Sequence, residues 1–280
     1  LLFVLATAPF SLLPSEFERL WTETLGALFF VANLVFWMDS GYFSSASESK
    51  PLLHTWSLGI EEQFYIFAPI VFAFVLRRFG ARLAAVVFSG LIISFIGCVA
   101  LTQFEPSTTF YLLPTRAWEL LAGSLLAVVT ARASMPAWTR QTGVRSLMAA
   151  SGLLLILVPI VSYSKSTSFP GYAAAAPVLG SVLVIGFSNG TAIGHLLSSR
   201  LLVFIGLISY SLYLWHWPLV VFFRNAGWLD SSIGRACVVL VSLILAWLSW
   251  RYVEKPTRNN ASFPVKKLLA LVISGALLVV

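Results

Sequence analysis

The stretch PLLHTWSLGIEEQFYIFAPI, residues 51–70, places two adjacent acids, a histidine and a glutamine at the head of a segment that is otherwise largely apolar. Apolar stretches of about 20 residues, long enough to cross a hydrocarbon layer of about 30 Å, recur along the chain between short polar breaks. Runs such as Ala236–Trp250 are apolar on every face, whereas a barrel strand would alternate. The sequence therefore predicts an all-α, polytopic transmembrane helical bundle of about nine to ten membrane segments.

The composition excludes a soluble domain. Hydrophobic residues make up 59% of the chain, charged residues only 10%, and the mean hydropathy is +0.89. The net charge of +7 is the excess of Lys and Arg that cytoplasmic loops carry, and it indicates no nucleic-acid partner. Cys98 and Cys237 each lie inside an apolar segment, so we expect neither a disulfide framework nor a metal site.

The apolar pattern predicts seven internal spans. We place them at 57–76, 83–102, 115–130, 146–163, 172–188, 202–223 and 233–250, with partial spans at both termini. The loops with Arg77 and Arg78, with Arg140 and Arg145, and with Arg251 and Lys255 are rich in basic residues. By the positive-inside rule these loops are cytoplasmic and the alternate loops face the other side.

The ends of the chain and the segment 17–38 are less regular. The opening residues LLFVLATAPFSLL and the closing run KKLLALVISGALLVV both read as incomplete helices, so we expect one integral-membrane domain over residues 1–280, truncated at both ends. The segment 17–38 either crosses the membrane or is re-entrant, because Pro14 and Ser15 can start a helix whose first turns carry Glu18, Arg19 and Glu23.

Ionisable residues inside spans are expensive, and by default they mark a functional site or a buried pair. Three predicted helices carry such residues at a similar depth in their outer halves: Glu61 and Glu62; Arg116 and Glu119; and His216 with Tyr213 three residues earlier. We predict that these helices meet there. His54 shares a face with Glu61 if it lies on the helix, and lies in the preceding loop if Ser57 is the N-cap.

Each of these features also has a structural interpretation. Glu61 and Glu62 can be acids favoured by a helix dipole, and Arg116 with Glu119 can be a structural ion pair. His216 can belong to an interfacial aromatic belt, and the Arg251 region can be a helix end among headgroups. If the interpretation as a site holds, a neutral histidine can act as general base in acyl transfer, and an arginine can stabilise an oxyanion.

Four blocks in order carry a resemblance to a known family: LLHTWSLGIEEQFY, FYLLPTRAWELLAGSLLA, ISYSLYLWHWPLVVF and WRYVEKPTR. Together they resemble the acyltransferase 3 family, in the branch of bacterial O-antigen and peptidoglycan O-acetylases. The resemblance implies a multi-pass enzyme of the bacterial inner membrane that transfers an acyl group, expected to be acetyl, from cytoplasmic acyl-CoA. The implied acceptor is a hydroxyl of an extracytoplasmic glycan such as lipopolysaccharide O-antigen or another cell-surface polysaccharide.

The resemblance also implies roles for individual residues. The expected catalytic residues are Glu61, Glu62, Arg116, Glu119 and His216. Expected substrate-binding residues are His54, Trp56, Gln63, Tyr65 and Tyr213, with Arg251 and Lys255 on the donor side. No metal and no bound cofactor is expected, since acyl-CoA is a donor substrate.

Family members begin with a helix that bears an Arg and, some residues later, a His, the pair usually assigned to catalysis. None of the three histidines of this chain, His54, His195 and His216, occupies that position. The resemblance therefore places the catalytic base in a preceding helix and leaves this chain alone without it. It also implies that a periplasmic hydrolase-like domain follows the chain.

Two other functions fit the residues without the resemblance. A transporter or exporter of a glycan precursor would use intramembrane Glu, Arg and His equally well, although no inverted repeat is visible. The third reading is a non-catalytic membrane partner. Consumption of acyl-CoA separates the enzyme from both.

Overall fold

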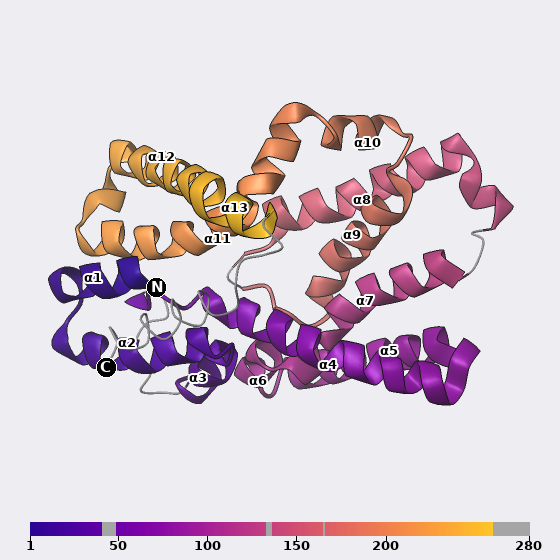
Figure 1. Ribbon diagram of the computed structural model, residues 1–280, viewed down its shortest axis with the longest axis horizontal. Helices are drawn as coiled ribbons and strands as arrows, with labels where there is room; N and C mark the ends of the chain where they lie inside the picture. Colours follow the sequence, from indigo (N-terminus) through magenta and orange to yellow (C-terminus); the bar gives the residue numbers. More distant parts are fainter. Residues whose placement is uncertain (41–48, 133–135, 165, 260–280) are drawn as a thin grey trace. The chain divides into compact units, whose positions relative to one another are not determined.

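The computed structural model describes residues 1–40, 49–132, 136–164 and 166–259, and within these ranges the regular elements are helices, with no strand (Figure 1). The chain divides into two compact units, Leu1–Trp56 with Val203–Val280, and Ser57–Leu202. We call these the terminal unit and the central unit and describe each by itself.

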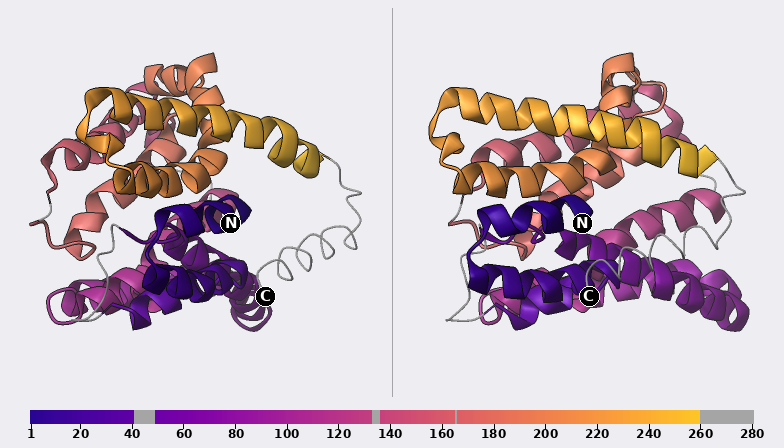
Figure 2. Two further views of the ribbon diagram at one scale, coloured as in Figure 1. Left: turned by 90° about the vertical axis from the view of Figure 1, so that its left-hand side faces the viewer. Right: turned by 60° about the vertical axis from the view of Figure 1, so that its left-hand side comes forward.

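The terminal unit contains two groups of helices. Its first group is α1 (Leu2–Ser11), α2 (Pro14–Leu28) and α3 (Ala32–Met38). Its second is α11 (Arg200–Asn225), which enters from the central unit, then η5 (Trp228–Asp230), α12 (Ser232–Ser249), a π-helical turn η6 (Trp250–Glu254) and α13 (Lys255–Asn259). Helices α11 and α12 run side by side in every view (Figure 2).

Helices α2 and α3 form a hairpin. Pro14 occupies the first turn of α2, and the Glu16 carboxylate accepts a hydrogen bond from the Leu13 amide at 3.0 Å. Helix α2 ends at Leu28, and Phe30 has a left-handed φ of 57°, which reverses the chain. A Cβ on Gly26 would lie 2.8 Å from Val35 Cγ2, so this glycine permits the close packing of α3 on α2.

Hydrogen bonds fix α11 against the end of α12. The Trp215 indole donates to Ser249 Oγ at 2.7 Å, and Ser211 Oγ donates to Glu254 Oε2 at 3.1 Å. Ser211 and Trp215 are four residues apart and therefore share one face of α11. That face is directed toward α12 and η6, which leaves neighbouring α11 side chains to meet other parts of the terminal unit.

The central unit begins with α4 (Thr55–Phe79), whose first two residues belong to the terminal unit. It continues with η2 (Gly80–Arg82), α5 (Leu83–Leu101), α6 (Pro106–Tyr111), α7 (Leu113–Arg132), η3 (Ala137–Arg140), α8 (Thr142–Ser162), η4 (Tyr172–Ala174), α9 (Ala175–Phe187) and α10 (Ala192–Leu197). Helix α5 packs on α7, and α8 packs on α9. Ser94 joins the first pair, donating to the Pro114 carbonyl at 2.6 Å and accepting from the Trp118 amide at 3.0 Å.

Six described helical stretches are long and apolar enough to cross a membrane, as expected of a multi-pass membrane protein: Thr55–Phe79, Leu83–Leu101, Pro106–Ala131, Thr142–Ser162, Arg200–Asn225 and Ser232–Arg258. They coincide with six of the seven predicted internal spans. The seventh, 172–188, falls on a shorter apolar helix, Tyr172–Phe187. The predicted total of nine to ten segments is therefore not confirmed.

The predictions for the segment 17–38 and for the closing run of the chain stay predictions. The segment 17–38 lies on two short helices, α2 and α3, and neither is among the six long apolar stretches. Whether it is re-entrant stays a prediction. The closing run KKLLALVISGALLVV lies outside the described residues.

Candidate functional site

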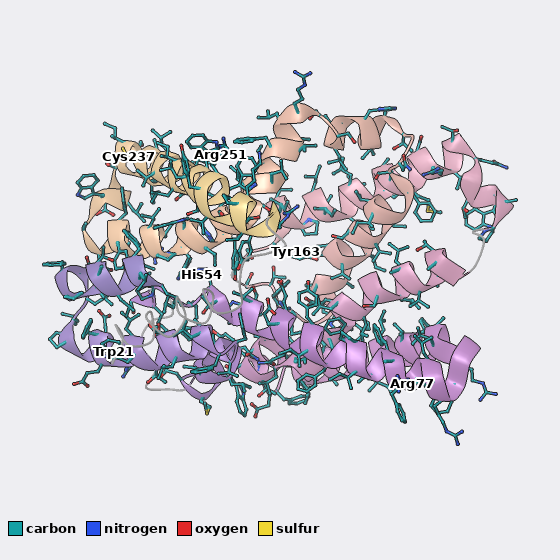
Figure 3. All side chains as sticks on the ribbon, viewed as in Figure 1. Trp21, His54, Arg77, Tyr163, Cys237 and Arg251 are labelled. Carbon is teal, nitrogen blue, oxygen red and sulfur yellow. The ribbon has the colours of Figure 1, made fainter. Side chains whose placement is uncertain are left out.

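Three aromatic side chains predicted from different parts of the sequence meet in the terminal unit. The His54 ring lies 5.2 Å from the Tyr213 ring and 5.9 Å from the His216 ring, measured between centroids. Tyr213 and His216 are 5.8 Å apart, and the Tyr213 hydroxyl donates a hydrogen bond to the His54 main-chain oxygen. His54, labelled in Figure 3, is buried, while the other two are half-buried. The sequence anticipated all three residues, and the fold brings them together.

Main-chain contacts set the tautomer of His216. Its Nδ1 lies 2.8 Å from the Tyr213 carbonyl oxygen and 3.2 Å from the Leu212 carbonyl oxygen. Carbonyl oxygens only accept hydrogen bonds, so Nδ1 carries the proton of the neutral ring. Nε2 then holds the lone pair, which is the form that a general base requires.

His216 also lines a cavity between α11 and α12. The cavity has a volume of about 520 Å³. Its lining is mostly apolar, with a few polar groups, and consists of Ser209, Leu212, Tyr213, His216 and Val220 from α11 and Val238, Val239, Ser242 and Leu243 from α12. An apolar cavity with few polar groups is the usual form of a small-molecule site.

The residues before α4 are held against α11 at a second point. The Trp217 indole donates to the Lys50 carbonyl oxygen at 2.8 Å, while the Lys50 ammonium forms a salt bridge with Asp39.

The His54 ring is uncharged. Burial, with His216 as a smaller second cause, lowers the pKa of His54 from 6.5 to about 3, so His54 is neutral at physiological pH. It therefore packs as an uncharged ring beside His216.

The start of α4 shows that His54 lies outside the helix and that Ser57 is not its N-cap. The helix begins at Thr55, two residues before the proposed cap Ser57, so His54 is the residue before the helix. Glu61 and Glu62 consequently lie in the second turn, and no acid lies in the first. A favourable first-turn dipole interaction therefore does not explain these two acids.

The central unit holds the other predicted charged residues. Arg116 Nη1 lies 2.9 Å from Glu119 Oε1, and the guanidinium lies 5.6 Å from the ring centroids of both Phe110 and Phe169. The Arg116 side chain is buried, and the Glu119 side chain borders a cavity of about 360 Å³ between α7 and α9. This is the pairing that the three-residue spacing predicted.

The remaining predicted residues are not drawn into one cluster. Glu61, Glu62, Gln63 and Trp56 are half-buried on α4, and Tyr65 is 58% exposed. Arg251 and Lys255 are exposed near the end of α12, where the Lys255 ammonium lies 5.4 Å from the Trp250 ring centroid (Figure 3). The structure thus shows two groups, His54 with Tyr213 and His216, and Arg116 with Glu119. Their union in a single polar cluster stays a prediction.

Sequence reasoning missed several contributors. It did not single out Lys50, Asp39 or Trp217 as partners, and it treated Glu23 only as a polar residue of an early helical turn. The structure buries Glu23 to 6% exposure. A charged residue in an apolar segment was the available signal, but its burial depends on the α2–α3 hairpin.

Comparison with known proteins supports one family. The family described as "Acyltransferase domain" matches residues 1–251. YrhL of Bacillus subtilis, provisionally named a peptidoglycan O-acetyltransferase, is 30% identical over 251 residues, covering 85% of this chain and 40% of its own length. The O-acetyltransferase OatA of Staphylococcus aureus is 28% identical over 272 residues, covering 91% of this chain and 45% of its own.

A further relative has the same character. The peptidoglycan O-acetyltransferase OatA of Listeria monocytogenes is 28% identical over 259 residues, which are 88% of this chain and 42% of the relative. The chain thus spans less than half the length of these curated relatives. No solved structure gave a significant match.

Proposed function

This chain belongs to the acyltransferase domain family, and from that membership we propose that the protein is a membrane O-acyltransferase that acetylates a hydroxyl of a cell-wall glycan. The names of the relatives support acetyl as the group transferred and peptidoglycan as the class of acceptor. They lend no support to lipopolysaccharide as the acceptor or to a transporter. The donor, acyl-CoA, and the location, the bacterial inner membrane, are part of the proposal.

The observation that carries the chemical proposal is the tautomer of His216, which we propose as the base in place of the preceding-helix histidine that the resemblance implies. Its Nδ1 proton is engaged by two main-chain carbonyls, so Nε2 is the basic atom of a residue that lines a cavity of about 520 Å³. A base of this kind removes the proton from an acceptor hydroxyl as its oxygen attacks the acyl carbonyl. The thioester C–S bond breaks, an ester C–O bond forms, and the thiolate takes up a proton.

The neighbours of His216 suit this role. Tyr213 and the neutral His54 pack against its ring, so its orientation is restrained by contacts as well as by the main chain. The mostly apolar lining of the cavity offers few groups that would hold a competing water molecule. In this proposal His54 and Tyr213 position the base, while Arg116 and Glu119 form a buried ion pair that stabilises the central unit.

The test is transfer of labelled acetyl from acetyl-CoA to cell-wall glycan, in membranes that carry the protein expressed from its complete gene. We expect His216→Gln to lower the transfer rate about 100-fold or more at an equal protein level. His195→Gln is the matched control, because His195 lies exposed on α10 in the central unit. Equal rates for wild type and His216→Gln would remove His216 from catalysis. No label in glycan with wild type would overturn the proposed activity.

A further inference from the structure

A second pocket lies in the α2–α3 hairpin of the terminal unit. It has a volume of about 310 Å³. One wall is polar and contains Arg19, Thr22 and Glu23 of α2, and the other is apolar and contains Val35, Phe36 and Met38 of α3. A polar wall that faces an apolar wall suits a ligand whose hydroxyl groups and carbon skeleton lie on different sides.

Glu23 is the unusual member of this pocket. Only 6% of the residue is exposed, and its Oε2 atom is buried with no hydrogen-bond partner among the described residues. A buried carboxyl oxygen without a partner is costly, so such a group normally has a partner in the functioning protein. Burial raises the pKa of Glu23 from 4.5 to about 7, with nearby Lys50 opposing this rise. Near neutral pH the carboxyl group can therefore donate a hydrogen bond as well as accept one.

The charges around the pocket are balanced. The acids Glu23 and Asp39 and the base Arg19 all line the pocket. A second base, Lys50, forms a salt bridge with Asp39. Because acidic and basic groups are present in equal number, the charge of the pocket favours neither an anionic nor a cationic ligand. A neutral ligand with several hydroxyl groups suits such a pocket, because each hydroxyl both donates and accepts.

Lys50 connects this pocket to the candidate catalytic residue. Its ammonium binds Asp39 at the pocket, and its carbonyl oxygen accepts a hydrogen bond from the indole of Trp217, the residue next to His216. The pocket and the base therefore belong to one connected part of the terminal unit.

We propose that the pocket between α2 and α3 is a subsite for a neutral sugar, in which Glu23 and Arg19 hydrogen-bond its hydroxyls and Val35 and Met38 contact its ring carbons. The assignment of this sugar to the acceptor glycan rests on the proposed function. The binding of the sugar does not, and it is measured without any acyl donor.

The experiment is calorimetric titration of the purified protein in detergent with chitotetraose, a neutral tetramer of N-acetylglucosamine. We expect saturable binding to wild type. Binding to Glu23→Leu should be weaker by about tenfold or more, because a hydrogen bond to a carboxyl group is lost. Glu18→Leu is the matched control, since Glu18 is exposed on the same helix and does not line the pocket. Its affinity should stay within about twofold of wild type.

A second variant protects the test from a folding defect. Thr22→Phe keeps Glu23 and lies at an exposed position of α2, but its ring would occupy the pocket, so we expect it to abolish binding. Absence of saturable binding to wild type, or unchanged affinity in folded Thr22→Phe, would overturn the proposal. Acetyl transfer without chitotetraose binding would refute this subsite alone, whereas binding without transfer would refute the proposed function alone.

Discussion

The Tyr213 hydroxyl donates a hydrogen bond to the main-chain oxygen of His54, 159 residues earlier in the chain, and the two rings pack edge to face at 5.2 Å. This contact fixes the residue before α4 against the helix that carries His216. We predict that Tyr213→Phe, which removes only the hydroxyl, costs about 1–3 kcal/mol because the His54 carbonyl loses its partner in a partly buried site.

The measurement for Tyr213→Phe is the thermal unfolding midpoint in detergent, together with kcat and KM for acetyl transfer. A positioning role predicts a lower kcat with a nearly unchanged KM. The conservative control is Tyr210→Phe, since Tyr210 is 50% exposed on the same helix. An equal loss in both variants would show that the hydroxyl of Tyr213 has no special part.

The stability of the terminal unit should fall in acid because of His54. Its pKa is about 3 in the folded protein and 6.5 when unfolded, chiefly because burial disfavours the charged ring. The unfolded state therefore binds more protons between these values, and the His54 contribution is fully present above pH 6.5 and lost as the pH falls toward 3. We expect His54→Gln to flatten the unfolding midpoint over this range. A profile of unchanged slope in that variant would contradict the prediction.

Glu23 should produce the opposite dependence on pH. Burial raises its pKa from 4.5 to about 7, against the influence of Lys50 and with a smaller contribution from Asp39. Its contribution to stability is fully present below pH 4.5 and is lost as the pH rises through 7, a change of about 3 kcal/mol. Glu23→Gln should remove this loss, and Glu18→Gln should keep it. Unfolding midpoints measured from pH 4 to 8 would decide between these outcomes.

The Arg116–Glu119 pair should be far more sensitive to truncation than the exposed pair Arg258–Glu254. Arg116→Met leaves Glu119 charged and largely buried, which we expect to cost about 3–5 kcal/mol and to lower the yield of folded protein. The side chain of Arg258 is 72% exposed and lies 3.8 Å from Glu254, so Arg258→Met should cost no more than about 1 kcal/mol.

A double variant tests the physical reason. Arg116→Met with Glu119→Leu removes both charges and should recover much of the stability lost in Arg116→Met alone. If the double variant were no more stable than the single one, the loss would come from the packing of Arg116 against Phe110 and Phe169 instead.

The crossing of α8 and α9 depends on two glycines. A Cβ on Gly180 would lie 2.6 Å from the Gly152 carbonyl oxygen, and one on Gly152 would lie 2.8 Å from the Gly180 carbonyl oxygen. Small residues allow membrane helices this close an approach. We expect Gly180→Ala to lower the stability by about 1–3 kcal/mol in thermal unfolding. Gly97→Ala on α5 meets no atom within 4 Å and should be neutral or stabilising.

Much of the secondary structure could be predicted because its signal is local. The predicted span 83–102 became Leu83–Leu101, and 233–250 became Ser232–Ser249. The Arg116–Glu119 pair followed from a three-residue spacing on one helix. Hydropathy did not predict the break between α2 and α3, because residues 25–38, which contain the end of α2, the turn and α3, are almost all apolar.

The sequence by itself determined that this protein is a bundle of membrane helices, because the length and hydropathy of each segment suffice to predict a span. Its motifs also identified the family and the three residues His54, Tyr213 and His216. Only the tertiary structure decided that these residues touch, that Nδ1 of His216 meets two carbonyls, and that Glu23 is buried beside a pocket. Contacts of this kind depend on which helix faces meet, and a helix that is apolar on every face carries no local signal of its orientation.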